Sequence, residues 1–219
     1  MCPVAERRRI ELGPVLTQLD GRLVRLERLE LGHVPALVAA AGESRQTYAF
    51  SWVPVGADAM RAYVEEALAT PDHLAFATRQ RADGRIVGST RYHQVTPWTW
   101  PPGHPLQRTD RPDVVEIGHT WLAASAQRTG INSEAKLLML SQAFDVWDVH
   151  AVHISTDHRN DRSRRAIERL GATLDGIRRA DRPGADGTVR DSALYSMTRT
   201  EWPAAKQRLE ERIYNRSTM

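Results

Sequence analysis

The first half of the chain alternates between the two-residue apolar period of strands and the longer period of helices. A charged and apolar alternation predicts a strand over residues 21–29, and the next apolar run predicts a helix over 31–41. A second amphipathic helix is expected over 57–70, because apolar residues recur there at helical spacing before a proline. Residues 74–79 and 85–95 then favour a hairpin whose turn contains a glycine.

The second half alternates strands with helices. The expected elements are strands over 114–122, 151–156, 173–179 and 189–198 and helices over 132–147, 161–170 and 203–214. Strands that are first joined as hairpins and then separated by helices indicate a mixed α/β sheet.

The segment over residues 96–113 has no regular period and carries five prolines and two tryptophans. Exposing Trp98 and Trp100 without a partner would be costly, so we expect a lid or a wall of an acceptor site. The alternative is a loop packed against its own domain or across a dimer contact.

Composition narrows the class of protein. The chain has 219 residues, and its 30 basic and 27 acidic residues leave a net charge of only +3, which is weak support for nucleic-acid binding. Cys2 is the sole cysteine, which excludes an internal disulfide and fits a reducing compartment. Without an apolar run long enough for a membrane span or signal peptide, we expect a cytoplasmic protein that does not bind membranes.

The turn Gln127-Arg128-Thr129-Gly130-Ile131-Asn132 joins a predicted strand to the start of a predicted helix. Glycine permits close approach of the backbone, and the first amides of a helix have no partner within it. These amides and the helix dipole predict a seat for a pyrophosphate. The chain lacks a P-loop and the three spaced glycines of a Rossmann motif, and an ordinary turn with a solvated arginine is the alternative.

A family resemblance is carried by two segments. EIGHTWLAASAQRTGINSEAK, from Glu116 to Lys136, resembles the acetyl-CoA motif of the GNAT acetyltransferases, especially the RimJ/RimL-like ribosomal-protein acetyltransferases. RNDRSRRAIERLGA, from Arg159 to Ala172, resembles the second cofactor element of that branch. Their order and their separation of about 30 residues make the pair more specific than either alone.

The resemblance implies a fold and a domain plan. We expect a GNAT-type mixed, mostly antiparallel central sheet of about seven strands, flanked by helices and with splayed central strands. The expected divisions are a leader of uncertain order over residues 1–18, one acetyltransferase domain over 19–202, and a C-terminal helix and tail over 203–219. A homodimer is plausible for this family.

The resemblance also implies a cofactor site for acetyl-CoA. Arg128, Thr129, Gly130, Ile131 and Asn132 would supply amides to the pyrophosphate, with Gln127 at the start of the turn. The strand residues Trp121, Leu122 and Ala123 would pair with the pantetheine amides. Asn160 would contact the cofactor, cap the following helix, or do both.

Acetyl transfer to an amine requires a base for the ammonium and an acid or stabiliser for the thiolate. Glu116 is the first candidate for the base, with His119 as its rival on the opposite face of a regular strand, unless a bulge intervenes. Ile167 occupies the position where many family members carry a tyrosine acid. Ser163 could take that role, contact the cofactor, or cap a helix.

The acceptor amine is the least specified part. A protein N-terminus and a small amine are both open, and Trp52, Trp98, Trp100 and His119 are candidates for binding it. The absence of a HExxH motif and of cysteine pairs argues against a metal site. A non-catalytic CoA-binding sensor and a basic nucleic-acid or protein-interaction module are the competing functions.

Overall fold

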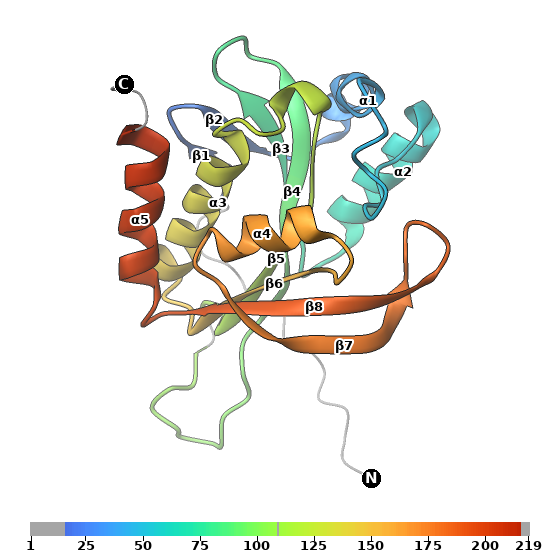
Figure 1. Ribbon diagram of the computed structural model, residues 1–219. Coiled ribbons are helices and arrows are strands. Elements are labelled where there is room, and N and C mark those ends of the chain that lie inside the picture. Colours follow the sequence, from blue (N-terminus) through green and yellow to red (C-terminus); the bar gives the residue numbers. More distant parts are fainter. Residues whose placement is uncertain (1–15, 109, 216–219) are drawn as a thin grey trace.

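The computed structural model describes residues 16–108 and 110–215, so most of the leader predicted over 1–18 and the last four residues of the tail predicted over 203–219 lie outside the described residues. One sheet of eight strands has the order β1-β2-β3-β4-β5-β6-β8-β7 (Figure 1). The strands are β1 Gln18–Asp20, β2 Val24–Arg28, β3 Leu74–Gln80, β4 Ile86–Thr96, β5 Val114–Leu122, β6 Ala151–Asp157, β7 Thr173–Pro183 and β8 Val189–Thr198.

The mostly antiparallel mixed sheet expected from the sequence is confirmed. All neighbouring strands are antiparallel except β5 and β6, which run parallel. The strand expected over 21–29 is β2, and the short edge strand β1 is the addition to the expected set.

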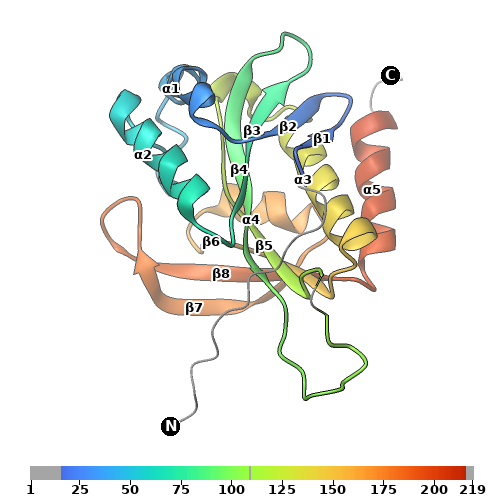
Figure 2. The same cartoon turned by 180° about the vertical axis from the view of Figure 1, so that it is seen from behind.

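Four of the five α-helices in the described residues form two pairs that flank the sheet. The helices are α1 Val34–Gly42, α2 Gly56–Ala69, α3 Ile131–Ser141, α4 Asp161–Glu168 and α5 Trp202–Tyr214, with short turns η1 Leu31–His33, η2 Ala124–Ala126 and η3 Gln142–Val146. The pair α1 and α2 lies on one side of the molecule and the pair α3 and α5 on the other, as Figures 1 and 2 show.

The predicted helix over 132–147 is interrupted. α3 ends at Ser141, and the chain continues as the wider π-turn η3 before it reaches Trp147. Within η3, Phe144 stacks on Trp202 of α5 with ring centroids 5.3 Å apart. The wider turn therefore belongs to the packing of α3 against α5.

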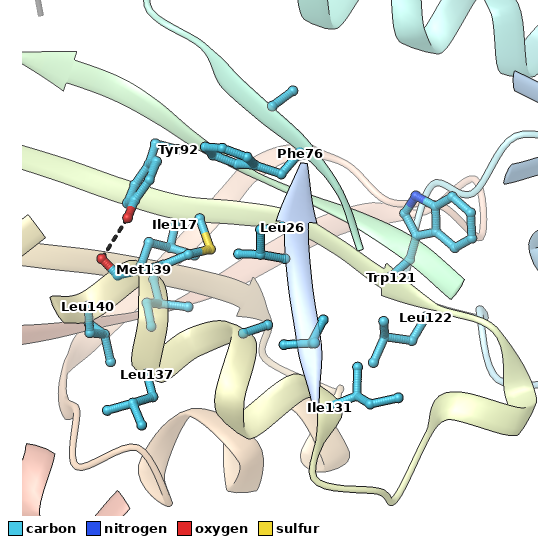
Figure 3. Close-up of a cluster of buried hydrophobic side chains, with 14 of the residues drawn as sticks. Leu26, Phe76, Tyr92, Ile117, Trp121, Leu122, Ile131, Leu137, Met139 and Leu140 are labelled. Carbon is cyan, nitrogen blue, oxygen red and sulfur yellow. Dashed lines mark hydrogen bonds between the residues drawn. The ribbon is translucent and has the colours of Figure 1, made fainter. Parts of the chain in front are cut away.

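A buried apolar cluster holds α3 against the middle of the sheet. Leu26, Phe76 and Ile117 come from three different strands and pack with Met139 of α3 (Figure 3). Tyr92 of β4 donates its hydroxyl proton to the Met139 carbonyl at 2.6 Å. Burying each large apolar side chain contributes about 1.5–3 kcal/mol, so this cluster fixes the position of α3.

Glu134 ties the start of α3 to two other elements. Its buried carboxylate accepts hydrogen bonds from the backbone amides of Arg22, Leu23 and Val24 at 2.9, 2.7 and 2.8 Å. The Tyr214 hydroxyl of α5 donates a fourth bond at 2.8 Å. A buried carboxylate with four donors is well satisfied, so the first turn of α3 is held rigidly.

The two central strands separate after a short paired stretch. β5 and β6 are in register only from Val114 opposite Ala151 to Glu116 opposite His153. Both strands continue beyond those pairs, to Leu122 and Asp157. The remaining part of β5 therefore lacks a partner on this side, as the expected splayed sheet requires.

Candidate active site

A cavity of about 420 Å³ opens where β5 and β6 separate. Its wall is formed by β5, β6, the turn before α3 and the first turns of α3, the length of α4, the loop before α2 and the β7–β8 hairpin. Of the residues proposed from the sequence, the wall includes Trp52, Glu116, His119, Trp121, Leu122, Gln127, Arg128, Thr129, Asn132, Asn160 and Ser163. It does not include Trp98, Trp100, Ala123, Gly130 and Ile131.

The turn before α3 presents backbone amides at one end of this cavity. Arg128 has a positive φ of 62°, which turns the chain into the helix. Thr129 braces the turn, because its hydroxyl donates to the Ala126 carbonyl at 2.7 Å and accepts from the Ile131 amide at 3.2 Å. The first i to i−4 hydrogen bond of α3 runs from the Glu134 amide to the Gly130 carbonyl. The backbone amides before Glu134 therefore have no acceptor within the helix.

Gly130 is required for a different reason than the approach of an anion. Its φ is −72°, which any residue adopts, and a Cβ there would lie 2.5 Å from Cδ1 of Leu23. The absent side chain thus makes room for the β1–β2 turn that Glu134 holds. The left-handed residue of the turn is Arg128, which the glycine pattern did not single out.

Gln127 and Arg162 brace the rim of the cavity. The Gln127 side-chain amide donates to the Thr47 hydroxyl at 2.8 Å and to the Leu122 carbonyl at 2.9 Å. Arg162 of α4 donates to Gln127 Oε1 at 3.0 Å and to the Thr47 carbonyl at 2.6 Å. These bonds join three segments around the cavity, including α4.

Asn160 caps α4. Its Oδ1 accepts a hydrogen bond from the Ser163 amide at 3.1 Å, which is N-cap geometry. Both side chains line the cavity, together with Ile167, which is buried. The hydroxyl of Ser163 is therefore the proton-bearing group that α4 offers near the position where many family members carry a tyrosine.

Two buried polar atoms in the wall lack a partner within the described residues. They are Nε1 of Trp121, a donor, and Oδ1 of Asn132, an acceptor. An unsatisfied buried polar group costs about 1–3 kcal/mol, and both atoms are shielded from the cavity, so a ligand could satisfy them only if the wall moved. The observation that fits a diphosphate is therefore the set of turn amides that precede the helical hydrogen bonds of α3.

The end of β5 is partly committed to the protein itself. The Leu122 carbonyl already accepts from the Tyr48 hydroxyl at 2.9 Å and from Gln127. The Ala123 amide donates to the Val87 carbonyl at 2.7 Å, and Ala123 does not line the cavity. Pairing with a pantetheine arm is therefore restricted to the part of β5 that precedes these groups.

Glu116 lies at the opposite end of the cavity, where β5 and β6 part. Its side chain is nearly buried, and Oε1 accepts a hydrogen bond from the Ser155 hydroxyl at 2.7 Å. His93 Nε2 lies 3.7 Å from the same oxygen, and burial lowers the pKa of His93. A carboxylate beside a neutral imidazole and a hydroxyl can hold a cationic amine and accept its proton.

His119 lines the same cavity because β5 is not regular. The β4–β5 register shifts between Ser89 and Arg91, and His119 has a positive φ of 50°. The structure therefore contains the irregularity in β5 that the sequence left open as a way to bring His119 to the same site as Glu116. Desolvation by the surrounding protein, with the charge of Arg91, lowers the pKa of His119 to about 3, which makes it a weak base.

Lys136 is a wall residue that the sequence patterns did not single out. It is 5% exposed on α3, and Nζ donates to the hydroxyls of Thr90 and Thr120 at 2.9 and 2.6 Å. Burial lowers its pKa to about 7. The available sequence signal for its burial was a lone lysine within the strongly apolar run of this helix, one turn after Asn132.

Trp98 and Trp100 lie apart from the cavity wall. Their loop projects from the end of the sheet in both Figure 1 and Figure 2. Trp98 stacks on His150 with centroids 5.1 Å apart, and Trp100 stacks on His104 at 4.3 Å. Within the chain, these rings pack against the protein's own histidines.

Within residues 16–108 and 110–215, no three histidine, cysteine or acidic side chains are grouped so that they could hold a metal ion. No helix within those ranges is long and apolar enough to cross a bilayer.

Comparison with known proteins agrees with this geometry. Residues 23–173 match the family model of the acetyltransferase (GNAT) domain, and the chain belongs to this family. It is therefore an acyltransferase whose family transfers acetyl groups from acetyl-CoA. No functionally curated protein matches the sequence.

Solved structures share the fold along most of the chain. A GCN5-related N-acetyltransferase from Brucella melitensis is 27% identical, with a TM-score of 0.78 over 96% of this chain and 89% of that one. A candidate acetyltransferase from T. thermophilus is 34% identical, with a TM-score of 0.73 over 90% and 97%. The microcin C7 self-immunity acetyltransferase MccE, in complex with acetyl-CoA and AMP, shares the fold at 17% identity, with a TM-score of 0.65 over 81% and 93%.

Proposed function

We propose that this protein is an acetyl-CoA-dependent N-acetyltransferase in which a primary amine attacks the thioester directly. The observation that carries the proposal is the shared cavity, which has the α3 turn at one end and Glu116 at the other. Cys2, the one cysteine of the chain, belongs to no recognised motif, so an acyl-enzyme on sulfur is disfavoured.

Glu116 acts as the general base. Its carboxylate attracts the ammonium form of the acceptor and removes a proton, directly or through water. The Ser155 hydroxyl holds Oε1 of Glu116 in place. Because this hydroxyl is uncharged, it competes less strongly with the acceptor ammonium for the carboxylate than a cationic side chain would. His119, with its pKa of about 3, stays neutral and lines the path of the amine.

The other end of the cavity binds and orients acetyl-CoA. The backbone amides before Glu134, including that of Asn132, hold the diphosphate. Bound acetyl-CoA supplies the thioester carbonyl that the amine attacks. Ser163 is the hydroxyl assigned to donate a proton to the leaving thiolate, because Ile167 has none to give.

The acceptor is a primary amine of one of two kinds, a protein N-terminus or a small amine. The RimJ/RimL-like resemblance favours an N-terminus, whereas the structural match to a ribosomal-protein-serine acetyltransferase from Vibrio cholerae is 16% identical and concerns the fold alone. We also propose a cytoplasmic location, from the single cysteine, and a homodimer, from the family.

Free-thiol release from acetyl-CoA over an amine panel tests the proposal, with CoA affinity measured in parallel by calorimetry. We expect micromolar or tighter CoA binding and turnover with at least one class of amine. Tight CoA binding without turnover on any acceptor would favour the sensor instead. Failure to bind CoA at all would contradict the cofactor site.

A further inference from the structure

Two arginines lie opposite each other near the Glu116 end of the cavity, which we call the acceptor end; the end at the α3 turn is the cofactor end. Arg182 of β7 and Arg190 of β8 are direct partners in the register of the hairpin, and both line the cavity. Like charges placed directly opposite each other on neighbouring strands are destabilising. The protein keeps this pair at a wall where a ligand would lie, which points to an anion between or beside them.

Arg190 is the less satisfied member of the pair. Arg182 Nε lies 2.8 Å from Asp181, a carboxylate that also pairs with Arg178 at 3.3 Å. Within the described residues, Arg190 forms no ion pair at 4.0 Å or less, and its side chain donates from Nε to the Ser192 hydroxyl at 2.9 Å. Its guanidinium therefore retains donors that an acidic group can use.

Arg190 is also partly removed from water. Burial lowers its pKa, and the nearby charge of Arg182 lowers it further, while Asp157, Asp181 and Glu116 act in the opposite direction. A desolvated guanidinium without a full carboxylate partner is costly, and a ligand carboxylate offsets that cost. The planar fork of arginine fits the two oxygens of a carboxylate.

The location separates this pair from the cofactor end. Arg190 lies close enough to Glu116 for the carboxylate to raise the pKa of Arg190. Arg182 lies close enough to His93 and His119 for its positive charge to lower the pKa of both. Arg162, by contrast, is bound to Gln127 at the cofactor end. The acceptor end thus combines a carboxylate with guanidinium groups, the complement of a molecule that carries both an ammonium and a carboxylate.

We propose that the acceptor carries a carboxylate near its amine, with Glu116 facing the ammonium and Arg190 binding the carboxylate. This inference rests on the proposed function and narrows its substrate class. A free amino acid and a peptide with an acidic residue beside its N-terminus share this chemistry. A plain amine lacks the carboxylate and leaves Arg190 with its hydrogen bond to Ser192 but without an ion-pair partner.

Matched acceptor pairs test the proposal in the full-length protein. Phenylalanine against phenethylamine, lysine against cadaverine and arginine against agmatine each differ by one carboxylate. Peptides that differ by an acidic or amide side chain beside the N-terminus form a second set. For at least one pair, we expect kcat/KM from thiol release to favour the carboxylated member by about tenfold or more, the usual scale of a charged hydrogen bond.

The variant Arg190→Gln should remove that preference by raising KM for the carboxylated member, while KM for acetyl-CoA stays unchanged. Arg190→Lys should recover part of it. Arg178→Gln is the control, because it removes a charge from the same hairpin at a position that does not line the cavity. The set that shows the preference distinguishes a free amino acid from a peptide.

The outcomes separate this inference from the proposed function. Turnover of amines without any preference for carboxylated members, or with a preference that Arg190→Gln leaves intact, would overturn the inference alone. If no acceptor releases thiol, the inference is tested by calorimetry instead, in which each member of a pair is titrated into the protein with CoA present. Binding of a carboxylated member that depends on Arg190 supports the inference, and equal binding of both members overturns it.

Discussion

The two ends of the cavity are built on different principles. At the end where we propose that the cofactor binds, backbone amides of one continuous turn and the caps around it are the groups available for contacts. At the acceptor end, charged and ionisable side chains arrive from separate strands, with Glu116 on β5 and Arg190 on β8. The first end is therefore encoded locally in the sequence, whereas the second exists only once the sheet has formed.

This difference makes the two ends respond differently to mutation. A contact made by backbone is insensitive to most side-chain truncations and sensitive to changes in the shape of the turn. A contact made by a charged side chain is lost when that one charge is removed.

The largest expected effect is that of Glu116→Gln, which removes the base and keeps the shape. We expect kcat to fall by about 100-fold or more, the usual range for a positioned general base, with CoA affinity nearly unchanged. Steady-state thiol release across pH and calorimetry with CoA measure the two effects. Glu65→Gln on the exposed surface of α2 is the control. Survival of activity at every pH would show that Glu116 is not the base.

Lys136 lies in the wall on α3, and its prediction concerns stability. Its pKa is lowered by burial to about 7 from an ordinary value of 10.5. Above pH 7 the unfolded chain holds this proton and the folded chain does not, so the free energy of unfolding rises with pH. The slope is about 1.4 kcal/mol per pH unit for one such group.

Lys136→Met should therefore stabilise the protein below pH 8 and flatten the rise between pH 7 and pH 9. Urea unfolding at several pH values measures both changes. Lys206→Met, which removes a surface lysine paired with Asp145, should leave the slope in place. An unchanged slope in Lys136→Met would mean that the folded protein keeps this ammonium protonated.

The third effect concerns the shape of the cofactor turn. In Gly130→Val, the new side chain meets Leu23, so the turn or its neighbour must move. We expect CoA to bind about tenfold more weakly because the turn shifts, together with a loss of stability of about 1–3 kcal/mol from overpacking against Leu23. Gly42→Val is the matched control, since a Cβ there has no neighbour within 4 Å.

Adding Leu23→Ala to Gly130→Val should restore part of the affinity by making room. Calorimetry with CoA and thermal melting measure binding and folding separately. If a folded Gly130→Val protein binds CoA as the wild type does, the turn does not hold the diphosphate.

The smallest effect separates two groups of tryptophans. Trp52 lines the cavity with a largely exposed ring, whereas the ring of Trp98 packs on His150 away from the wall. Trp52→Ala should raise KM for the acceptor by about threefold to tenfold, as the loss of an aromatic contact does, and Trp98→Ala should leave it unchanged. The reverse order would place the acceptor near the projecting loop, for example across a dimer.

The sequence predicted the fold and the position of the strand-to-helix turn over residues 127–132, because both depend on local patterns. Apolar periods placed the strands, and the run from Gln127 to Asn132 joins a strand to a helix as expected. The break of the long helix after Ser141 was missed, since a π-turn leaves no mark in an apolar period.

The acceptor end was harder to predict because it depends on register and burial. The position of His119 follows from an irregularity in the pairing of β5 with β4, which alternation alone cannot place. Arg190 resembles any other surface arginine until β7 and β8 pair. The burial of Lys136 likewise depends on threonines that are distant in the sequence.

A crystal structure with CoA bound tests the central claim most directly. The account predicts the diphosphate on the amides of residues 128–133 and the pantetheine arm between β5 and β6, with its thiol directed toward the Glu116 end. A diphosphate bound elsewhere, or an arm that leaves the gap between these strands empty, would contradict it.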